Sequence, residues 1–402
     1  MSGWATVKLD DVARRGSGHT PSKGHPEYWH GPVKWVSLRD TLRLDRGLIR
    51  ETASTITAAG VAHSSAVVHP AGTVVLLRDA GVGKSAILGA DMAVSQHFMA
   101  WVCGPKFHNW FLYYVLQAWK PEFERIASGN TIKTIGLDYF RQFLVPLPGI
   151  DEQRAIAETL READDLIGSL ERAITKRRAI KQGMVQELLA GRTRLPGFSD
   201  AWTTRKLSAV GKFLRGRGIK RDDVRLTGVP CIRYGELYTT YTDYTVSTVS
   251  FVRAAVAATA LPIRGGDILF AGSGETKEEI GMSVAYIGDK PAVAGGDIIV
   301  LRATEYDPVY LASLLNTPGV AHQKARGGQG DAVVHINWRV LAEIEVTVPA
   351  LPEQHAIAEV LRDADGEIAT LERRLKSARA VKTGVMQELL TGRTRLPVGA
   401  AL

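Results

Sequence analysis

The chain has 402 residues, of which 45% are hydrophobic and 23% charged, and it carries a formal net charge of +8. This composition is typical of a globular protein of two or three domains and excludes a disordered or low-complexity chain. The two cysteines, Cys103 and Cys231, lie far apart and outside any Cys-x-x-Cys motif, which excludes a disulfide framework or a thiolate zinc site and favours a reducing cytoplasm.

The hydropathy pattern gives no sign of a signal peptide or a membrane span. The first residues, MSGWATVKLDDVARR, lack the apolar core of a signal peptide. The most apolar stretch, 251–263, is interrupted by Arg253 and Pro262 and is shorter than the roughly 20 residues that a bilayer span needs. We therefore expect a soluble cytoplasmic protein. Its positive charge lies mainly in residues 1–150, which by itself favours a polyanionic partner only weakly.

Residues 1–150 form the first expected domain. This segment contains three strand-like runs, KWVS (34–37), GTVVLL (72–77) and FLVPLP (143–148). Between the second and third lies HNWFLYYVLQ (108–117), whose apolar residues recur at helical spacing. Short strands mixed with a few helices predict an α/β domain.

Two motifs in this domain favour structural interpretations. GVGKS (81–85) looks like the end of a nucleotide-binding P-loop, but Arg78 stands where that motif needs glycine, so a glycine-rich turn between two strands is favoured. His19, His25 and His30 lie in a loop without the spacing of a zinc site, and we expect no bound metal. No nucleophile elbow, HExxH, Rossmann fingerprint or Asn-Pro-Pro-aromatic run is present, so we expect no catalytic residues and no cofactor in this chain.

A long repeated segment follows the first domain. The 45 residues from Glu152 recur from Glu353 at a constant offset of 201 without a gap, and 28 of the 45 pairs are identical. A match of this length indicates that the chain is two copies of one unit, each a globular domain followed by a repeated tail. The predicted tails are residues 151–196 and 353–402.

The repeated tail has the apolar spacing of a coiled-coil helix. About 40 residues correspond to a helix of roughly 60 Å. Because both copies carry the same seam, we expect the two helices to pair antiparallel, related by a pseudo-twofold axis, with one domain at each end; two independent surface helices are the alternative. In the first copy the seam residues are Ile156, Leu160, Ala163, Ile167, Leu170 and Ile174.

The seam is interrupted by Arg177 and Lys181 before apolar residues resume. The two halves of each helix can therefore face different partners. We predict that a partner protein contacts the resumed positions, which are Met184 and Leu188 in the first copy and Val385 and Leu389 in the second.

Residues 197–352 form the second expected domain, whose outline follows the first. CIRY (231–234), GDILFA (266–271), DPVYLASLLN (307–316) and IEVTVP (344–349) match the four runs of the first domain in order. The domains have otherwise diverged. Repeated helices beside diverged domains predict one shared structural task and two different targets.

The sequence resembles the specificity subunits of Type I restriction-modification systems along essentially its whole length. GHTPSKGHPEYWHGPVKWVS (18–37) is similar to the start of a target recognition domain, with a histidine where a second glycine is usual, and residues 72–88 look like the family's hairpin. VPLPGIDEQRAIAETL (145–160) and VPALPEQHAIAEVL (348–361) resemble the Pro-x-x-Glu-Gln entry to the helical regions. The second domain departs from the pattern, with GRGIKRDD (216–223) in place of the Gly-Thr-Pro-Ser run.

The resemblance implies a non-catalytic DNA-binding subunit of a host-defence enzyme. It implies two methyltransferase subunits as partners, which bind S-adenosylmethionine, and a nuclease-translocase subunit that joins for cleavage. Each domain would read one half of a bipartite, asymmetric site on double-stranded DNA. Half-sites on one DNA face lie about 34–36 Å apart, a separation that paired helices can define and a flexible linker cannot. The alternatives are a coiled-coil adaptor without sequence readout and an enzyme that itself modifies or cleaves DNA.

The side chains expected to contact DNA are polar and basic loop residues that can reach base edges or phosphates. A solvated surface charge is the alternative for each of them. Tyr28, Trp29 and Trp35 are expected to belong to the local core. The predicted contacts are Lys23, Arg39, Lys84, Asn130 and Lys133 in the first domain, and Arg217, Lys220, Arg221, Arg233, Lys277, Arg326 and Gln329 in the second.

Overall fold

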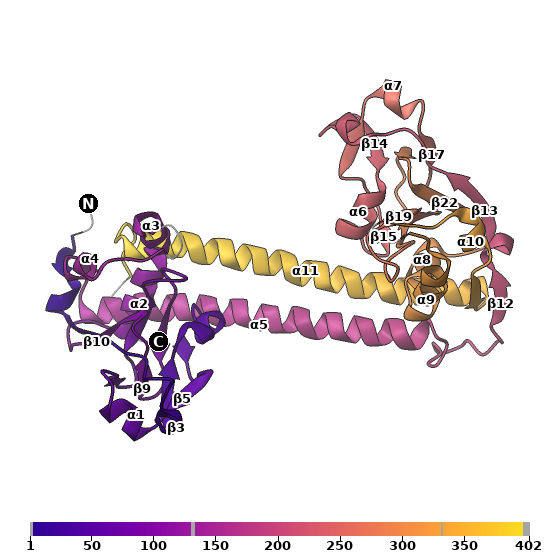
Figure 1. The fold of residues 1–402 in the computed structure, drawn as a ribbon. Coiled ribbons are helices and arrows are strands. Elements are labelled where there is room, and N and C mark those ends of the chain that lie inside the picture. The colour runs from indigo at the N-terminus through magenta and orange to yellow at the C-terminus, as the bar shows by residue number, and fades with distance from the viewer. Residues whose placement is uncertain (1–2, 130–132, 331–332, 397–402) are drawn as a thin grey trace. The chain divides into compact units, whose positions relative to one another are not determined.

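The computed structural model describes residues 3–129, 133–330 and 333–396. Two long helices, α5 (Ile150–Leu188) and α11 (Leu351–Leu390), are coloured magenta and yellow in Figure 1. They begin 201 residues apart, which is the offset of the sequence repeat, and each follows one α/β head. The expected fold class, two α/β domains with two long paired helices, is confirmed.

The chain divides into two compact units, and both long helices contribute to each. Unit 1 consists of Met1–Glu171 and Arg373–Leu402, and unit 2 of Arg172–Glu372. We call the residues before α5 head 1 and the residues between α5 and α11 head 2. Unit 1 is therefore head 1 packed with the first half of α5 and the second half of α11. Unit 2 is head 2 packed with the second half of α5 and the first half of α11.

Head 1 contains two mixed sheets and one short antiparallel ribbon. The large sheet has the order β2 (Ala13–Ser17), β10 (Phe98–Cys103), β7 (Val74–Leu77), β8 (Ser85–Leu88) and β4 (Leu48–Ile49). The small sheet has the order β5 (Ser54–Ile56), β3 (Trp29–Val36), β9 (Met92–Val94) and β6 (Val68–His69). The ribbon pairs β1 (Ala5–Lys8) with β11 (Leu144–Leu147), and the helices are α1 (Ala58–Ala62), α2 (Asn109–Ala118), α3 (Lys120–Ile126) and α4 (Leu137–Arg141).

Head 2 repeats this plan strand by strand. Its large sheet has the order β13 (Gly211–Arg215), β22 (Ile298–Ala303), β18 (Asp267–Ala271), β20 (Ser283–Tyr286) and β15 (Tyr244–Thr245). Its small sheet has the order β16 (Ser250–Val252), β14 (Val229–Ile232), β21 (Ala292–Ala294) and β17 (Leu261–Ile263). The ribbons are β12 (Thr203–Lys206) with β24 (Glu345–Val348) and β19 (Ser273–Gly274) with β23 (Val334–His335), and the helices are α6 (Tyr234–Thr239), α7 (Ala254–Ala257), α8 (Pro308–Leu315), α9 (Pro318–Gly327) and α10 (Trp338–Ala342).

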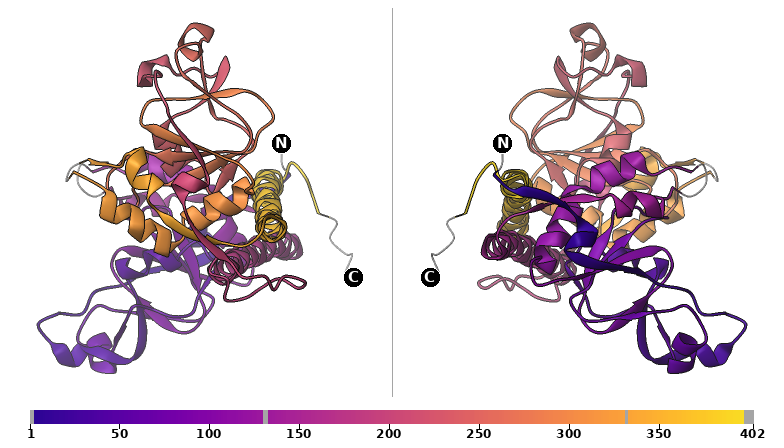
Figure 2. Two further views of the ribbon diagram at one scale, coloured as in Figure 1. Left: turned by 90° about the vertical axis from the view of Figure 1, so that its right-hand side faces the viewer. Right: turned by 90° about the vertical axis from the view of Figure 1, so that its left-hand side faces the viewer.

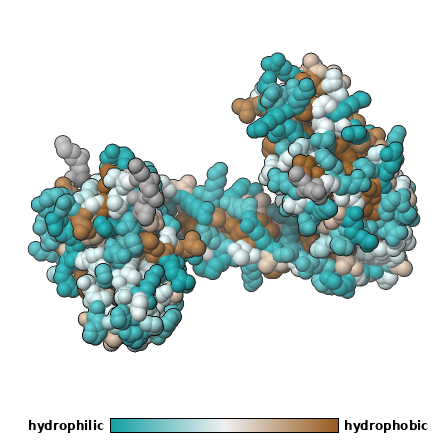
Figure 3. All heavy atoms as spheres, viewed as in Figure 1, coloured by the Kyte–Doolittle hydropathy of each residue, from teal (hydrophilic) through white to brown (hydrophobic). Residues whose placement is uncertain are grey.

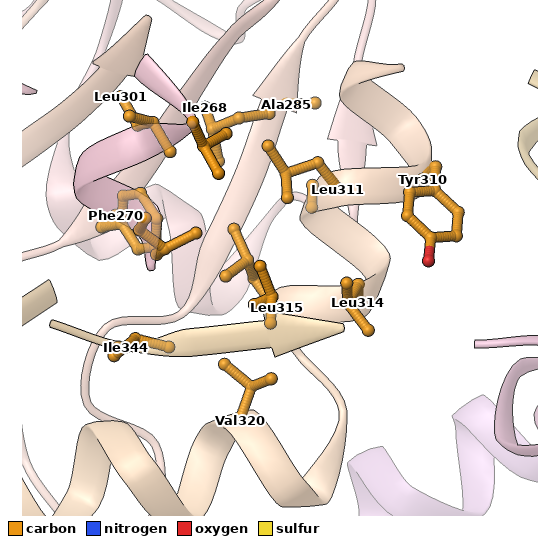
Figure 4. Close-up of a cluster of buried hydrophobic side chains, with 14 of the residues drawn as sticks. Ile268, Phe270, Ala285, Leu301, Tyr310, Leu311, Leu314, Leu315, Val320 and Ile344 are labelled. Carbon is orange, nitrogen blue, oxygen red and sulfur yellow. The ribbon is translucent and has the colours of Figure 1, made fainter. Parts of the chain in front are cut away.

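One helix covers the large sheet in each head, and it is the helix that the apolar spacing predicts. Figure 4 shows Leu311 and Leu315 of α8 directed towards Ile268 and Leu301 of the sheet. These four side chains are fully buried, and α2 packs the equivalent core of head 1. Burial of these leucines and isoleucines supplies most of the driving force that holds helix and sheet together.

The long helices run antiparallel within each unit, side by side in the views of Figure 2. In unit 2, Lys181 of α5 donates to Asp365 of α11 at 2.7 Å. In unit 1, Arg379 of α11 donates to Glu171 of α5 at 2.6 Å. Each helix is rich in acidic residues in its first half and in basic residues in its second half, so antiparallel pairing sets opposite charges against each other. Parallel pairing would set like charges together, so the charge pattern selects the orientation.

A buried carboxylate closes unit 1 at the start of α5. Glu152 is 2% exposed and accepts hydrogen bonds from the Trp4 indole at 3.1 Å and from the Arg395 guanidinium, whose Nη2 lies at 2.8 Å. The guanidinium also lies over the Trp4 ring, 5.4 Å from its centroid. We call this group of three residues the helix-start clasp of unit 1.

Unit 2 has an equivalent clasp at the start of α11, although the buried Trp202 indole N–H has no hydrogen-bond partner among the described residues. Arg194 donates to both carboxylate oxygens of Glu353, at 2.6 and 2.7 Å, and lies over the Trp202 ring. Glu353 stands 201 residues after Glu152, Arg194 stands 201 residues before Arg395, and Trp202 stands 198 residues after Trp4. The equivalence shows that the end of each repeat folds back onto the start of the other.

Removing the negative charge of the unit 1 clasp is expected to destabilise that unit. In Glu152→Gln, an amide NH2 group replaces one carboxylate oxygen. It would then face the N–H donors of Trp4 and Arg395, where the oxygen accepts their hydrogen bonds. The Tm should therefore fall by about 2–4 °C. Differential scanning calorimetry measures the change. Glu162→Gln, on an exposed position of the same helix, is the matched control and should leave the Tm unchanged; equal Tm values for both variants would contradict a stabilising clasp.

Candidate nucleic-acid interface

Three segments far apart in the sequence meet at one end of the large sheet of head 1. They are Arg78–Asp79 after β7, Ser95–His97 before β10, and Lys133–Thr134. The Arg78 N–H donates to the His97 carbonyl at 2.9 Å, and the Ala80 N–H donates to the Lys133 carbonyl at 3.3 Å. We call these three segments the edge cluster of head 1.

A cavity of about 590 Å³ opens beside this cluster. Lys23 and Arg39, two of the predicted DNA contacts, are both exposed and both line it. Trp35 is buried as expected, whereas Trp29 is only half-buried and forms part of the cavity wall. The two indoles meet edge to face, with ring centroids 5.2 Å apart. The cavity therefore combines a rigid aromatic wall with basic side chains at its opening.

Two polar side chains of the cavity wall were not among the predicted contacts. Gln96 is exposed, and its amide oxygen accepts a hydrogen bond from the Thr20 hydroxyl at 2.6 Å. His97 is half-buried, and its Nδ1 lies 2.6 Å from Asp79 Oδ1. Both side chains are thus held by neighbours from other segments, and only the folded chain reveals those neighbours.

The other predicted contacts of head 1 lie around this region. Lys84 is half-buried and its Nζ lies 3.4 Å from the Thr41 carbonyl, on the same 3-10 helix as Arg39. Lys133 is exposed within the edge cluster. Asn130 lies outside the described residues, so its prediction stays open.

The structure confirms a glycine-rich turn at GVGKS. The segment joins β7 to β8, and Gly81 and Gly83 have φ values of +134° and +88°, which favour glycine. A Cβ on Gly83 would lie 2.9 Å from Lys120 Cγ, so the turn packs closely against α3. Among the described residues, no group of three or more His, Cys, Asp or Glu side chains could hold a metal ion.

Head 2 has an edge cluster built from the equivalent segments. The Gly272 N–H donates to the Asp297 carbonyl at 2.7 Å, and the Ile336 N–H donates to the Gly272 carbonyl at 3.0 Å. The Ser273 hydroxyl lies 2.9 Å from His335 Nδ1. The segments after β18, before β22 and before α10 therefore meet as their counterparts do in head 1.

A smaller cavity, of about 270 Å³, adjoins this second cluster. Gln329, a predicted contact, lines it and exchanges two backbone hydrogen bonds with His335. Arg215, Asp297 and Asn337 also line it and were not predicted. Asn337 caps α10, since its side chain accepts from two backbone N–H groups.

The remaining predicted residues of head 2 have different environments. Arg233 is half-buried and pairs with Glu236 at 2.8 Å, so its charge is already partnered within the head. The other five are exposed and do not line the cavity beside the cluster. These five are Arg217, Lys220, Arg221, Lys277 and Arg326.

A buried lysine fixes the elements that carry two of these exposed residues. Lys324 of α9 is 2% exposed and its Nζ donates to the Gly281 carbonyl at 2.7 Å. Burial lowers the pKa of Lys324 to about 7. The contact ties the loop that bears Lys277 to the helix that bears Arg326.

The predicted partner contacts on the long helices are largely covered by the chain itself. Leu188 is 5% exposed in the core of unit 2, and Leu389 is 4% exposed in the core of unit 1. Met184 and Val385 are half-buried against the same cores. Little of either leucine is therefore exposed in this structure, and partner contact at these four positions stays a prediction.

Figure 3 shows hydrophilic side chains predominating on the visible face of each head. Within the described residues, the helices include none that combines the length and hydropathy of a membrane span.

The family model described as "Type I restriction modification DNA specificity domain" matches residues 1–177 and 199–378. Among curated proteins, the chain is 24% identical over 302 residues to the Type I restriction enzyme MjaVIII specificity subunit of Methanocaldococcus jannaschii, covering 71% of this chain and 70% of that protein. It is 26% identical over 186 residues to the EcoR124I/EcoR124II specificity subunit of Escherichia coli, covering 44% of this chain and 45% of that protein.

Solved structures share the fold at low sequence identity. The S subunit of a Type I restriction-modification system from M. genitalium aligns with a TM-score of 0.60 at 15% identity, over 97% of this chain and 96% of that one. The HsdS subunit from Thermoanaerobacter tengcongensis aligns with a TM-score of 0.51 at 16% identity, over 98% and 97%.

Proposed function

The chain belongs to the family of Type I restriction-modification DNA specificity subunits, which are non-catalytic components of those enzymes, and on this premise we propose that each head reads one half of a bipartite, asymmetric site on double-stranded DNA. The observation that carries the proposal is the pair of edge clusters. Both heads bring the same three segments together beside a cavity, yet the side chains presented there differ. A shared scaffold with different polar groups suits two readers of different base sequences.

We further propose that the long helices fix the spacer between the half-sites and dock two methyltransferase subunits, with a nuclease-translocase subunit joining for cleavage. The two long helices pair antiparallel with opposite charges facing each other, and this pairing supports their role as a rigid spacer. S-adenosylmethionine would be bound by the methyltransferase subunits, because this chain lacks the sequence motifs of that cofactor site.

The state of the cysteines is in keeping with action on cytoplasmic DNA. Cys103 and Cys231 are both free. Burial raises the pKa of Cys103 to about 12 and that of Cys231 to about 11, so both thiols stay protonated at neutral pH.

Coexpression with the cognate methyltransferase subunit, followed by single-molecule sequencing of the methylated genome, tests the proposal. We expect one bipartite methylated motif, with two different half-sites and a fixed spacer, and no methylation from this chain alone. Methylation by the isolated chain would contradict a non-catalytic role. Binding to DNA pools without an enriched bipartite sequence would instead favour an adaptor that does not read DNA.

A further inference from the structure

One short turn occupies the same place in both heads and differs completely in chemistry. It joins β9 to β10 in head 1 and β21 to β22 in head 2, and the flanking strands are related by a constant offset of 200 residues. The turn is Ser95-Gln96-His97 in head 1 and Gly295-Gly296-Asp297 in head 2. An amide and an imidazole in one copy are thus replaced by a single carboxylate in the other.

In both heads this turn lies on the wall of the cavity beside the edge cluster. Ser95, Gln96 and His97 line the cavity of head 1, and Asp297 lines that of head 2. Gln96 and Asp297 are exposed, so their side chains are available to a ligand. The Ser95 hydroxyl is buried and has no hydrogen-bond partner among the described residues, which leaves a polar group beside the head 1 cavity for a ligand or bound water to satisfy.

The turn of head 1 is held in place before any DNA binds. The Ser95 N–H donates to the Val36 carbonyl at 2.9 Å, which ties the turn to the small sheet. Arg78 Nε approaches the Gln96 carbonyl at 3.4 Å, and Asp79 holds the His97 ring. A turn fixed on both sides loses little conformational entropy on binding, which favours precise readout.

The hydrogen bond from Thr20 also fixes what Gln96 offers. Since the Thr20 hydroxyl donates to Oε1, the amide keeps a second oxygen lone pair and both Nε2 hydrogens. One acceptor beside one donor matches the N6 amino group and N7 of adenine in the major groove. A carboxylate such as Asp297 offers acceptors only, which suits the N4 amino group of cytosine.

We propose that this turn is the base-reading turn of each head, with Gln96 contacting an adenine in one half-site and Asp297 a cytosine in the other. The inference rests on the proposed function and adds to it the residues that make the two half-sites different.

The test is a reciprocal pair of variants, Gln96→Ala and Asp297→Ala, each assembled as full chain with the cognate methyltransferase. Methylation rates are measured on duplexes that carry every base at each position of the wild-type motif. We expect Gln96→Ala to reduce the preference for A·T at one position of one half-site by about 10–100-fold, the range of a lost bidentate contact. Asp297→Ala should relax one C·G position of the other half-site, and each variant should keep the half-site that the other one relaxes.

The outcomes separate failure of this inference from failure of the proposed function. A wild-type complex with no bipartite motif overturns the proposed function and this inference with it. A bipartite motif that Gln96→Ala leaves unchanged, or that loses rate equally on every duplex, overturns the inference alone. If Gln96→Ala loses its preference at a C·G position instead of an A·T position, the adenine contact is overturned. Gln96 is exposed, so the Tm of its variant should match that of the wild type.

Discussion

One helical turn inserted into each long helix should lengthen the spacer of the recognised DNA site by about 1–2 base pairs, while both half-sites stay the same. Four residues add roughly 6 Å to a helix, and base pairs stack at roughly 3.4 Å. The insertions belong between Glu171 and Arg172 in α5 and between Glu372 and Arg373 in α11, where one unit ends and the other begins. Inserted there, they leave both clasps and the described cross-helix ion pairs within their own units.

Methylome sequencing of cells that express the double insertion with the methyltransferase measures the spacer. The matched control places the same four residues between Thr304 and Glu305, two exposed residues in the connection from β22 to α8, where neither long helix changes length. It should methylate the wild-type motif. A spacer that stays constant in the double insertion, with methylation retained, would show that the helices do not set it.

Loss of the two basic side chains at the head 1 cavity should weaken DNA binding by about 10–100-fold at moderate salt. Lys23 and Arg39 are exposed on the cavity wall, where they can neutralise phosphates or contact a base. Each phosphate contact contributes about one unit to the slope of log affinity against log salt. The double variant Lys23→Ala/Arg39→Ala should therefore reduce that slope by about 1–2.

Titrations of a duplex carrying the methylated motif, at several salt concentrations, measure both quantities. Arg125→Ala/Arg141→Ala is the matched control, because it removes the same charge from exposed positions of head 1 that do not line the cavity. If both double variants lose affinity to the same extent, overall charge rather than the cavity accounts for binding. An unaltered salt slope in Lys23→Ala/Arg39→Ala would contradict phosphate contacts at these two residues.

Features that recur at short spacing along the chain could be predicted from the sequence. Features that depend on contacts between loops far apart in the sequence could not. The apolar seam and the gapless repeat predicted α5 and α11, because helical periodicity is a local property. Lys23 and Arg39 were predicted as separate loop residues, but nothing local indicates that they share a cavity. Gln96 and His97 were missed because their roles come from Thr20 and Asp79, which lie 76 and 18 residues away.

The resumed seam shows a second limit of local patterns. Leu188 and Leu389 are apolar at helical spacing, and such spacing indicates that a side chain is covered without showing what covers it. Here the cores of the two units cover them. Comparing the two heads at the strand offset of 200, rather than at the helix offset of 201, is the signal that could have singled out Gln96 opposite Gly296 and His97 opposite Asp297.

The two clasps give the chain a cyclic organisation. Arg395, near the last described residues, closes onto Glu152 and Trp4, while Arg194, midway along the chain, closes onto Glu353 and Trp202. Unit 1 is thus completed by a segment encoded beyond head 2, whereas unit 2 is one continuous segment that contains its whole clasp. Because Trp4 and Arg395 meet in unit 1, we expect a circular permutant that begins at head 2 to retain both clasps.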